Sequence, residues 1–338
     1  MGGRNPALPA RMTAVRYTAF GPAGETLRLE DVPVPAPGHG ELLVEMRASG
    51  VNPHDTKKRS GWLGVPLPGG GVIPHSDGAG TVVAVGEGVC ETRIGQRVFL
   101  VGVGPKDGTC ARYAVASADN AFPLPATLSW EQGASVGIPA FTAYFAVLHA
   151  GPVAGRTVLI HGGAGCVGRC AVELARYGGA TVIATVSSAE KAAIAREAGA
   201  HHVLDYRSDD VAAAVAAVTA GRGADLVVDV DFGANLRVDA AAVAENGRVA
   251  SYSSTSNRTP ELDYYAFALK GVTLHFVQGG KMPPEVRREG GRLIAALLHD
   301  GRLVPHVASV HSMGAVAAAH EEMEGGRTIG NIVVAIDP

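Results

Sequence analysis

The stretch that decides the fold runs from Thr157 to Gly168 and has the sequence TVLIHGGAGCVG. It opens with an apolar run, of the kind found in strands buried on both faces of a parallel sheet. GxGxxG spacing follows at residues 163–168, and a helical pattern continues to Tyr177. In that context the glycines allow a tight turn and close approach to a pyrophosphate, which the helix N-terminus attracts. The stretch predicts a dinucleotide-binding loop; the alternative is a glycine-rich turn without a ligand.

The strand–helix cycle repeats after this loop. Strands are expected at 181–186, 202–204, 225–230, 248–252 and 272–277, and helices at 189–198 and 209–219. Strands that alternate with helices in this way predict a parallel, doubly wound sheet.

The segments before and after this strand–helix repeat have a different hydrophobic pattern. Short alternating runs broken by Gly and Pro, at 42–47, 80–85 and 97–101, predict a β-rich fold of the barrel type. The tail predicts a helix at 285–299 and strands at 303–310 and 332–336. We therefore expect a nucleotide-binding domain at 133–278, inserted between two parts of a β-rich domain at 13–132 and 279–338. Residues 1–12 are expected to be a loose leader.

Composition excludes several classes of protein. The 338 residues carry a formal charge of −3, so no basic face for nucleic acid is expected. The four cysteines lack zinc-site spacing and fit the reduced thiols of a cytoplasmic protein. Residues 132–155 contain no Asp, Glu, Lys or Arg, but Pro139, His149 and Pro152 favour a buried helix over a membrane span.

The end of the second strand indicates which dinucleotide binds. An NAD site has an acidic residue about 20 residues after the loop, whereas this chain has Ser187 and Ser188, followed by Lys191. The next strand ends at Tyr206-Arg207. Small hydroxyls and cations suit a 2′-phosphate, so NADP(H) is expected. The alternatives are a capping box from Ser187 to Glu190 and a solvated Lys191.

Several collinear motifs carry a family resemblance. Asn52-Pro-His-Asp-Thr56 is followed by Asp77-Gly-Ala-Gly80, the glycine loop, Gly301-Arg-Leu-Val-Pro305 and Gly330-Asn331-Ile-Val-Val. Together they resemble the quinone oxidoreductase (zeta-crystallin type) branch of the medium-chain dehydrogenase/reductase superfamily, over nearly the whole chain from Thr13. The resemblance implies an α/β protein with a GroES-like β-rich catalytic domain and a Rossmann domain, with the cofactor between them.

The resemblance also shows what this chain lacks. Zinc-dependent members have a catalytic Cys where this chain has Asn52 and a ligand His where it has Ser76. His75 is one position away, and residues 136–139 hold no Cys or His. No metal is therefore expected, and His75 is interpreted as structural. The family often has a Tyr where this chain has Lys57.

These observations predict a zinc-independent reductase of quinones or α,β-unsaturated carbonyls. Asn52 is the candidate for the amide that bonds the substrate oxygen or the nicotinamide, and a turn-capping Asn is its alternative. Lys57 is the second catalytic candidate, with His54 and Trp62 beside it. The alternative functions are an enoyl-thioester or alkenal reductase and a low-turnover NADPH-binding protein. The expected cofactor-binding residues are Thr142, Gly163, Gly165, Cys166, Val167, Gly168, Ser187, Ser188, Lys191, Tyr206 and Asn331.

A competing motif is GxSxG at 133–137, the pattern of a serine hydrolase. No apolar strand leads into it, so an ordinary approach to a helix at 140–148 is favoured.

The run from Gly271 to Val277 (GVTLHFV) is expected to be the sixth strand, at an edge of the doubly wound sheet. An apolar edge strand is normally covered or paired. We expect a homodimer that pairs this strand across a two-fold axis, with Thr273 and His275 near the axis.

Overall fold

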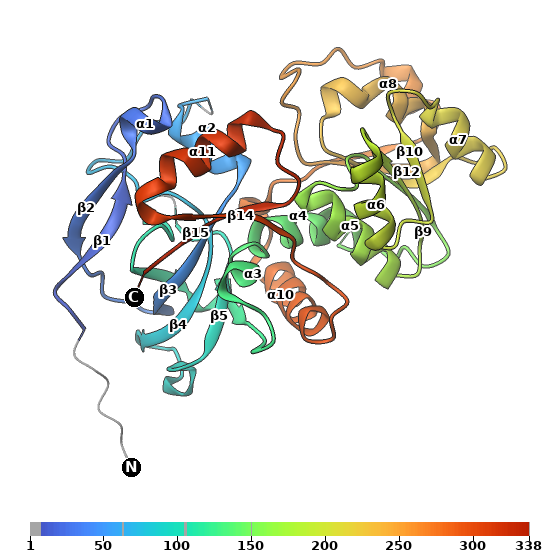
Figure 1. Cartoon of the computed structure of the whole chain (residues 1–338). Coiled ribbons are helices and arrows are strands. Elements are labelled where there is room, and N and C mark those ends of the chain that lie inside the picture. The colour runs from blue at the N-terminus through green and yellow to red at the C-terminus, as the bar shows by residue number, and fades with distance from the viewer. Residues whose placement is uncertain (1–7, 63, 105–106, 150, 338) are drawn as a thin grey trace. The chain divides into compact units, whose positions relative to one another are not determined.

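The computed structural model describes residues 8–62, 64–104, 107–149 and 151–337. The first seven residues of the expected leader lie outside this part of the chain. The chain forms two compact units. Unit 1 consists of Met1–Ile138, Arg287–Asp300 and Pro305–Pro338, and unit 2 of Pro139–Val286 and Gly301–Val304 (Figure 1).

Unit 2 is built on a six-stranded parallel sheet with the order β10-β9-β8-β11-β12-β13. This order confirms the doubly wound sheet and the edge position of the last strand. The strands are β8 (Thr157–Ile160), β9 (Thr181–Val186), β10 (His202–Asp205), β11 (Ala224–Asp229), β12 (Val243–Ser251) and β13 (Thr273–Phe276). The helices are α4 (Gly137–Val147), α5 (Cys166–Tyr177), α6 (Ala189–Glu197), α7 (Val211–Val218), α8 (Phe232–Ala242) and α9 (Tyr264–Ala268).

The central strands of this sheet are apolar because helices cover both faces. Leu159, Ile183 and Val227 are fully buried in one hydrophobic cluster, which supplies the main drive for folding of the unit. The sequence prediction missed α8, whose alanines, glycine and isolated polar residues give a weak amphipathic pattern.

Unit 1 is β-rich, as expected. Within the described residues, one sheet has the order β14-β15-β3-β4-β5-β7 with β6 paired to β3, and β1 pairs with β2 separately. The strands are β1 (Arg11–Arg16), β2 (Arg28–Pro33), β3 (Glu41–Val51), β4 (Asp77–Val85), β5 (Arg97–Leu100), β6 (Tyr113–Ser117), β7 (Ala121–Pro123), β14 (Val307–Ser312) and β15 (Asn331–Ala335). The α-helices are α1 (Ala23–Thr26), α2 (Pro53–Arg59), α3 (Trp130–Ala134), α10 (Pro284–His299) and α11 (Val316–Gly325). Short 3-10 turns of this unit are η1 (Glu91–Arg93), η2 (Ala118–Asn120) and η4 (Met313–Ala315), whereas η3 (Gly279–Lys281) belongs to unit 2.

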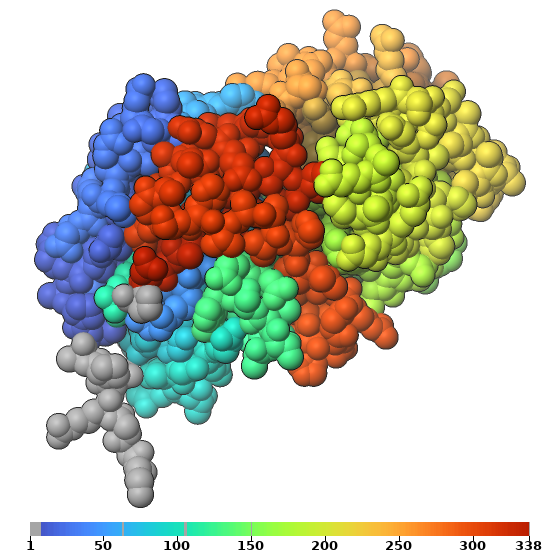
Figure 2. Space-filling model, in the orientation of Figure 1, coloured from blue at the N-terminus to red at the C-terminus, as the bar shows by residue number. Residues whose placement is uncertain are grey.

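The C-terminal segment completes unit 1. Helix α11 packs against α1 and α2, and in Figure 2 the red C-terminal segment lies beside the blue N-terminal residues. The predicted start of the strand at 303–310 is wrong, because β14 begins at Val307. Pro305 precedes it and has no N–H to donate to a neighbouring strand.

The segment around the GxSxG motif begins with a helix. Ser129 caps α3 by accepting the backbone N–H of Gln132. The Ser135 hydroxyl donates to the carbonyl of Gln132 at 2.8 Å, so no strand-to-helix elbow presents this serine. In the charge-free stretch, α4 ends at Val147, and no helix in the described part of the chain is long and apolar enough to cross a membrane.

Candidate active site

The glycine loop joins β8 to α5 in unit 2. Gly165 is the N-cap of α5, and in the described part of the chain no side chain caps the first N–H groups of this helix. A Cβ on Gly163 would lie 2.7 Å from the Cβ of Ala184, and one on Gly168 would collide with the carbonyl of Gly162. These glycines let the loop close tightly and leave unpaired N–H groups at the positive end of a helix. The loop therefore fits a pyrophosphate.

Two cations converge on the end of β9. The Lys191 Nζ lies 3.2 Å from the Ser187 Oγ, and an Arg207 nitrogen donates to the Ser187 carbonyl at 3.1 Å. The residue that caps α6 is Ser188, whose Oγ accepts the backbone N–H of Lys191. The alternative capping box from Ser187 to Glu190 is therefore wrong, and Ser187 is left facing the two cations. This arrangement suits a phosphate dianion.

The other predicted cofactor residues divide between the two units. Thr142 lies on α4 and is largely buried. Cys166 and Val167 form the first turn of α5, and burial raises the pKa of the Cys166 thiol to about 11. Tyr206 is exposed. Asn331 belongs to unit 1, where its amide donates to the carbonyl of His306 at 3.2 Å.

Asn52 is the N-cap residue of α2 in unit 1. Its backbone N–H donates to the Asp55 carboxylate at 2.8 Å, so the capping role that stood as the alternative is present. Its amide Nδ2 donates to the Asp77 Oδ2 at 2.8 Å, and Asp77 also accepts the backbone N–H of Ile138 at 2.7 Å. Burial raises the pKa of Asp55 to about 7 and that of Asp77 to about 8. The sequence reasoning did not select Asp77, although it stands in a quoted motif.

The second catalytic candidate, Lys57, lies farther along α2. Its Nζ sits 4.8 Å from the centre of the Trp62 ring, a cation–π distance. The pKa of His54 is lowered by burial and by the neighbouring cations Lys58 and Lys57. The predicted residues Lys57, His54 and Trp62 thus share one cationic, partly aromatic region of unit 1.

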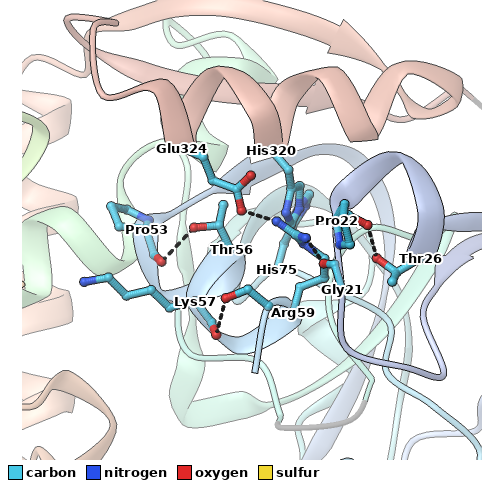
Figure 3. A network of polar contacts seen from close by, with 11 residues as sticks. Gly21, Pro22, Thr26, Pro53, Thr56, Lys57, Arg59, His75, His320 and Glu324 are labelled. Carbon is cyan, nitrogen blue, oxygen red and sulfur yellow. Dashed lines mark hydrogen bonds and ion pairs between the residues drawn. The ribbon is translucent and has the colours of Figure 1, made fainter. Parts of the chain in front are cut away.

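His75 is held inside a buried network that joins three segments of unit 1. Its Nδ1 lies 2.7 Å from the Ser49 Oγ, and its Nε2 lies 2.9 Å from the Nε2 of His320 on α11. Figure 3 shows this pair beside the ion pair between Arg59 of α2 and Glu324 of α11. Burial lowers the pKa of His320 to about 3 and that of His75 well below its usual value. Both rings are therefore neutral at pH 7 and act as structural links.

The donor set around these residues does not fit a metal. In the described ranges, no group of three or more His, Cys, Asp or Glu side chains could hold an ion. His75 uses both ring nitrogens within the network, and the Asn52 amide is bound to Asp77.

Comparison with known families agrees with both units. Residues 38–126 match the model for the alcohol dehydrogenase GroES-like domain, and residues 166–296 match the model described as zinc-binding dehydrogenase. A β-rich unit made from both chain ends, together with a doubly wound unit that carries a dinucleotide loop, defines the medium-chain dehydrogenase/reductase class of oxidoreductases. The quinone oxidoreductase of Sus scrofa is 35% identical over 320 residues, which cover 92% of this chain and 94% of that protein. The chain belongs to this quinone oxidoreductase family.

Further relatives support the same assignment. The human quinone oxidoreductase is 33% identical over 319 residues, covering 93% of this chain and 94% of that protein. Among solved structures, a mycobacterial protein complexed with NADPH has a TM-score of 0.84 and 30% identity, over 96% of this chain and 100% of that one. A 2-haloacrylate reductase has a TM-score of 0.83 and 28% identity, over 96% of this chain and 100% of that one.

Proposed function

We propose that this chain is an NADPH-dependent oxidoreductase that reduces quinones or α,β-unsaturated carbonyls without zinc. The observation that carries the proposal is that unit 2 contains both a glycine loop leading into the uncapped N-terminus of α5 and two cations, Lys191 and Arg207, at Ser187. The first feature suits a pyrophosphate and the second a 2′-phosphate. The names of the relatives, quinone oxidoreductases and a structure complexed with NADPH, support this choice of cofactor and acceptor.

The chain's own residues then bind the cofactor and the substrate and orient them toward each other. NADPH, when bound, supplies a hydride. The α5 N-terminus and the two cations would hold its phosphates, and Thr142 is the candidate residue for contacting its nicotinamide. Asn52 is the candidate contact for the reacting region, and its amide is fixed by Asp77. A quinol oxygen takes its proton from water, so no dedicated general acid is assigned.

A screen of acceptors tests the function. NADPH consumption is followed with a quinone, a simple enone and an enoyl-CoA at matched concentrations. Turnover with the quinone or the enone, and a lower kcat/KM with the enoyl-CoA, is expected. Preference for the enoyl-CoA would replace the proposal by its thioester alternative, and tight NADPH binding without turnover would indicate a binding protein.

The zinc-free mechanism has its own test. Elemental analysis of the purified protein is expected to give far less than one zinc per chain, and activity is expected to survive chelation. A stoichiometric zinc whose removal abolishes turnover would refute this part of the proposal.

The proposal includes a homodimer paired through β13. This strand lies at the edge of the sheet, and large apolar side chains are exposed on it, on α9 and at the C-cap of α9: Phe276 is 66% exposed, Tyr265 69% and Leu269 83%. A second copy of the same strand would cover them and satisfy the open strand edge. The free state of all four cysteines supports a reducing compartment such as the cytoplasm.

Light scattering tests the dimer. A mass of about twice 34.5 kDa is expected at micromolar concentration. Phe276→Lys places a charge at the open edge and should give a monomer that still folds. The matched control is Val310→Lys, which changes an exposed apolar residue on β14 of the other sheet and should leave the dimer intact. A monomeric unmodified chain would refute the pairing.

A further inference from the structure

A chain of buried polar side chains runs beneath the glycine loop of unit 2. His161 directly follows β8, Thr185 lies in β9 and Asp239 lies in α8. His161 is 3% exposed, Thr185 1% and Asp239 0%. Burying polar groups costs free energy unless each has a partner, and here the partners lead from one residue to the next.

The contacts link α8 to the loop backbone. The His161 Nε2 lies 3.0 Å from the Asp239 Oδ1, and the His161 Nδ1 lies 3.2 Å from the Thr185 Oγ1. The Thr185 Oγ1 accepts the backbone N–H of Gly162 at 3.3 Å, and the Thr185 carbonyl accepts that of Gly163 at 2.9 Å. Asp239 therefore reaches the backbone of Gly162 through two other side chains, and the backbone of Thr185 binds that of Gly163.

The chemistry of each group fixes the direction of these bonds when the ring is neutral. When the Asp239 carboxyl is ionised it can only accept, and the proton of the neutral His161 ring then sits on Nε2. The Nδ1 atom is then an acceptor, and the Thr185 hydroxyl donates to it. The oxygen of Thr185 keeps its lone pairs for the N–H of Gly162. The carboxylate thus sets the proton positions as far as the loop.

A purely structural role accounts poorly for Asp239. Its second oxygen, Oδ2, is buried and has no hydrogen-bond partner among the residues that the structure describes. Asp239 also lies close enough to Asp229 to help raise the pKa of that carboxyl to about 6, after burial itself. A buried acid next to another acid is costly, and an apolar residue of similar volume is often more stabilising in such a place.

We propose that Asp239 is a positioning residue for dinucleotide binding, which acts through His161 and Thr185 to hold the Gly162–Gly163 backbone in its binding conformation. The inference rests on the proposed function, because it assumes that this loop binds the cofactor's pyrophosphate. The chain of bonds restricts the loop before the ligand arrives, so less conformational entropy is lost on binding. Because NADPH and NADH share the pyrophosphate, both should depend on it equally.

The first experiment changes the link nearest the loop. Thr185→Val keeps the shape but removes the hydroxyl, and Thr185→Ser keeps the hydroxyl. Kd values for NADPH and NADH are measured by nicotinamide fluorescence. We expect Thr185→Val to weaken both by about tenfold, which is about 1.4 kcal/mol, and Thr185→Ser to restore binding to within about threefold. In turnover, KM for NADPH should rise while kcat stays near that of the unmodified enzyme.

The matched control is Thr157→Val, the same replacement at a buried threonine at the opposite end of the same sheet. It should leave both Kd values unchanged. Equal Kd values for Thr185→Val and the unmodified chain would overturn the inference, and so would an equal loss in Thr157→Val.

The second experiment changes Asp239, the residue of the hydrogen-bonded chain that is farthest from the glycine loop. Asp239→Asn keeps an oxygen that accepts from His161, whereas Asp239→Leu keeps only the approximate volume. Thermal melting checks that each variant is folded. Asp239→Asn should bind both nucleotides nearly as tightly as the unmodified chain, and Asp239→Leu should bind both about tenfold more weakly. If Asp239→Leu does not fold, equal binding by Asp239→Asn and Thr185→Val would overturn the proposal. Failure of the unmodified chain to bind either nucleotide would instead refute the proposed function.

Discussion

The cation pair at Ser187 should decide which nicotinamide nucleotide the enzyme uses. Replacing Lys191 by Met keeps most of the aliphatic stem and removes the charge that lies 3.2 Å from the Ser187 Oγ. Arg207→Met removes the second cation, which is held by the Ser187 carbonyl. In both variants a 2′-phosphate would lose a charged donor, whereas the 2′-hydroxyl of NADH would lose little.

The magnitude follows from the exposure of the two cations. A hydrogen bond to a charged group contributes about 1.5–3 kcal/mol, and solvent screening reduces this at the surface. Lys191 is half-buried and Arg207 is exposed. We therefore expect a Kd for NADPH about tenfold higher in Lys191→Met, or about 1.4 kcal/mol. Arg207→Met should have the smaller effect, about threefold.

Fluorescence titration with NADPH and NADH measures both effects. The unmodified chain should bind NADPH at least about tenfold more tightly, and this preference should shrink as salt rises, because ions screen the phosphate. Arg196→Met removes another exposed cation of α6 and is the control. Equal affinities in the unmodified chain, or equal losses for both nucleotides in Lys191→Met, would refute the phosphate reasoning.

Two further predictions follow from the buried groups. The free energy of unfolding should fall as the pH rises from 6.5 to 8, because the folded state holds protons on Asp77 and Asp55 that the unfolded state has released. The neutral pair His75 and His320 has the opposite effect on the free energy of unfolding, but only below about pH 6.5. Urea unfolding at several pH values should therefore show that the free energy of unfolding falls less steeply with pH above 6.5 in Asp77→Asn than in the unmodified chain. An equally steep fall in the variant would contradict the raised pKa of Asp77. Gly168→Ala should abolish measurable NADPH binding, since the added methyl collides with the Gly162 carbonyl; calorimetry that finds normal affinity would show that the loop tolerates a side chain there.

Local patterns were enough to predict the nucleotide-binding half. The alternation of apolar strands and helices after Thr157, together with the glycine spacing, predicted all six strands and the edge position of β13. These features depend on neighbours in sequence, namely side-chain period, turn glycines and helix starts. Ser187, Ser188 and Lys191 could be proposed from the sequence for the same reason, because they lie within five residues of the end of β9.

Prediction failed where the pattern was weak or the partner lay far away in sequence. Helix α8 was missed because its residues form no clear apolar stripe, so Asp239 had no predicted position. The capping box from Ser187 to Glu190 stood as an alternative because either of two adjacent serines fits the spacing, and only the backbone geometry selects Ser188.

Sequence patterns alone were enough for the class of fold, the strands along the nucleotide-binding half, the edge position of its last strand and the location of the glycine loop, because short-range periodicity and glycine spacing encode them. The tertiary structure decided which distant polar groups meet. It tied Asn52 to Asp77, His75 to His320 across 245 positions, and His161 to Asp239 across 78. Such pairs leave no periodic trace in the chain. They form because a buried polar group needs a partner, and only the packing of the folded chain determines which one lies within reach.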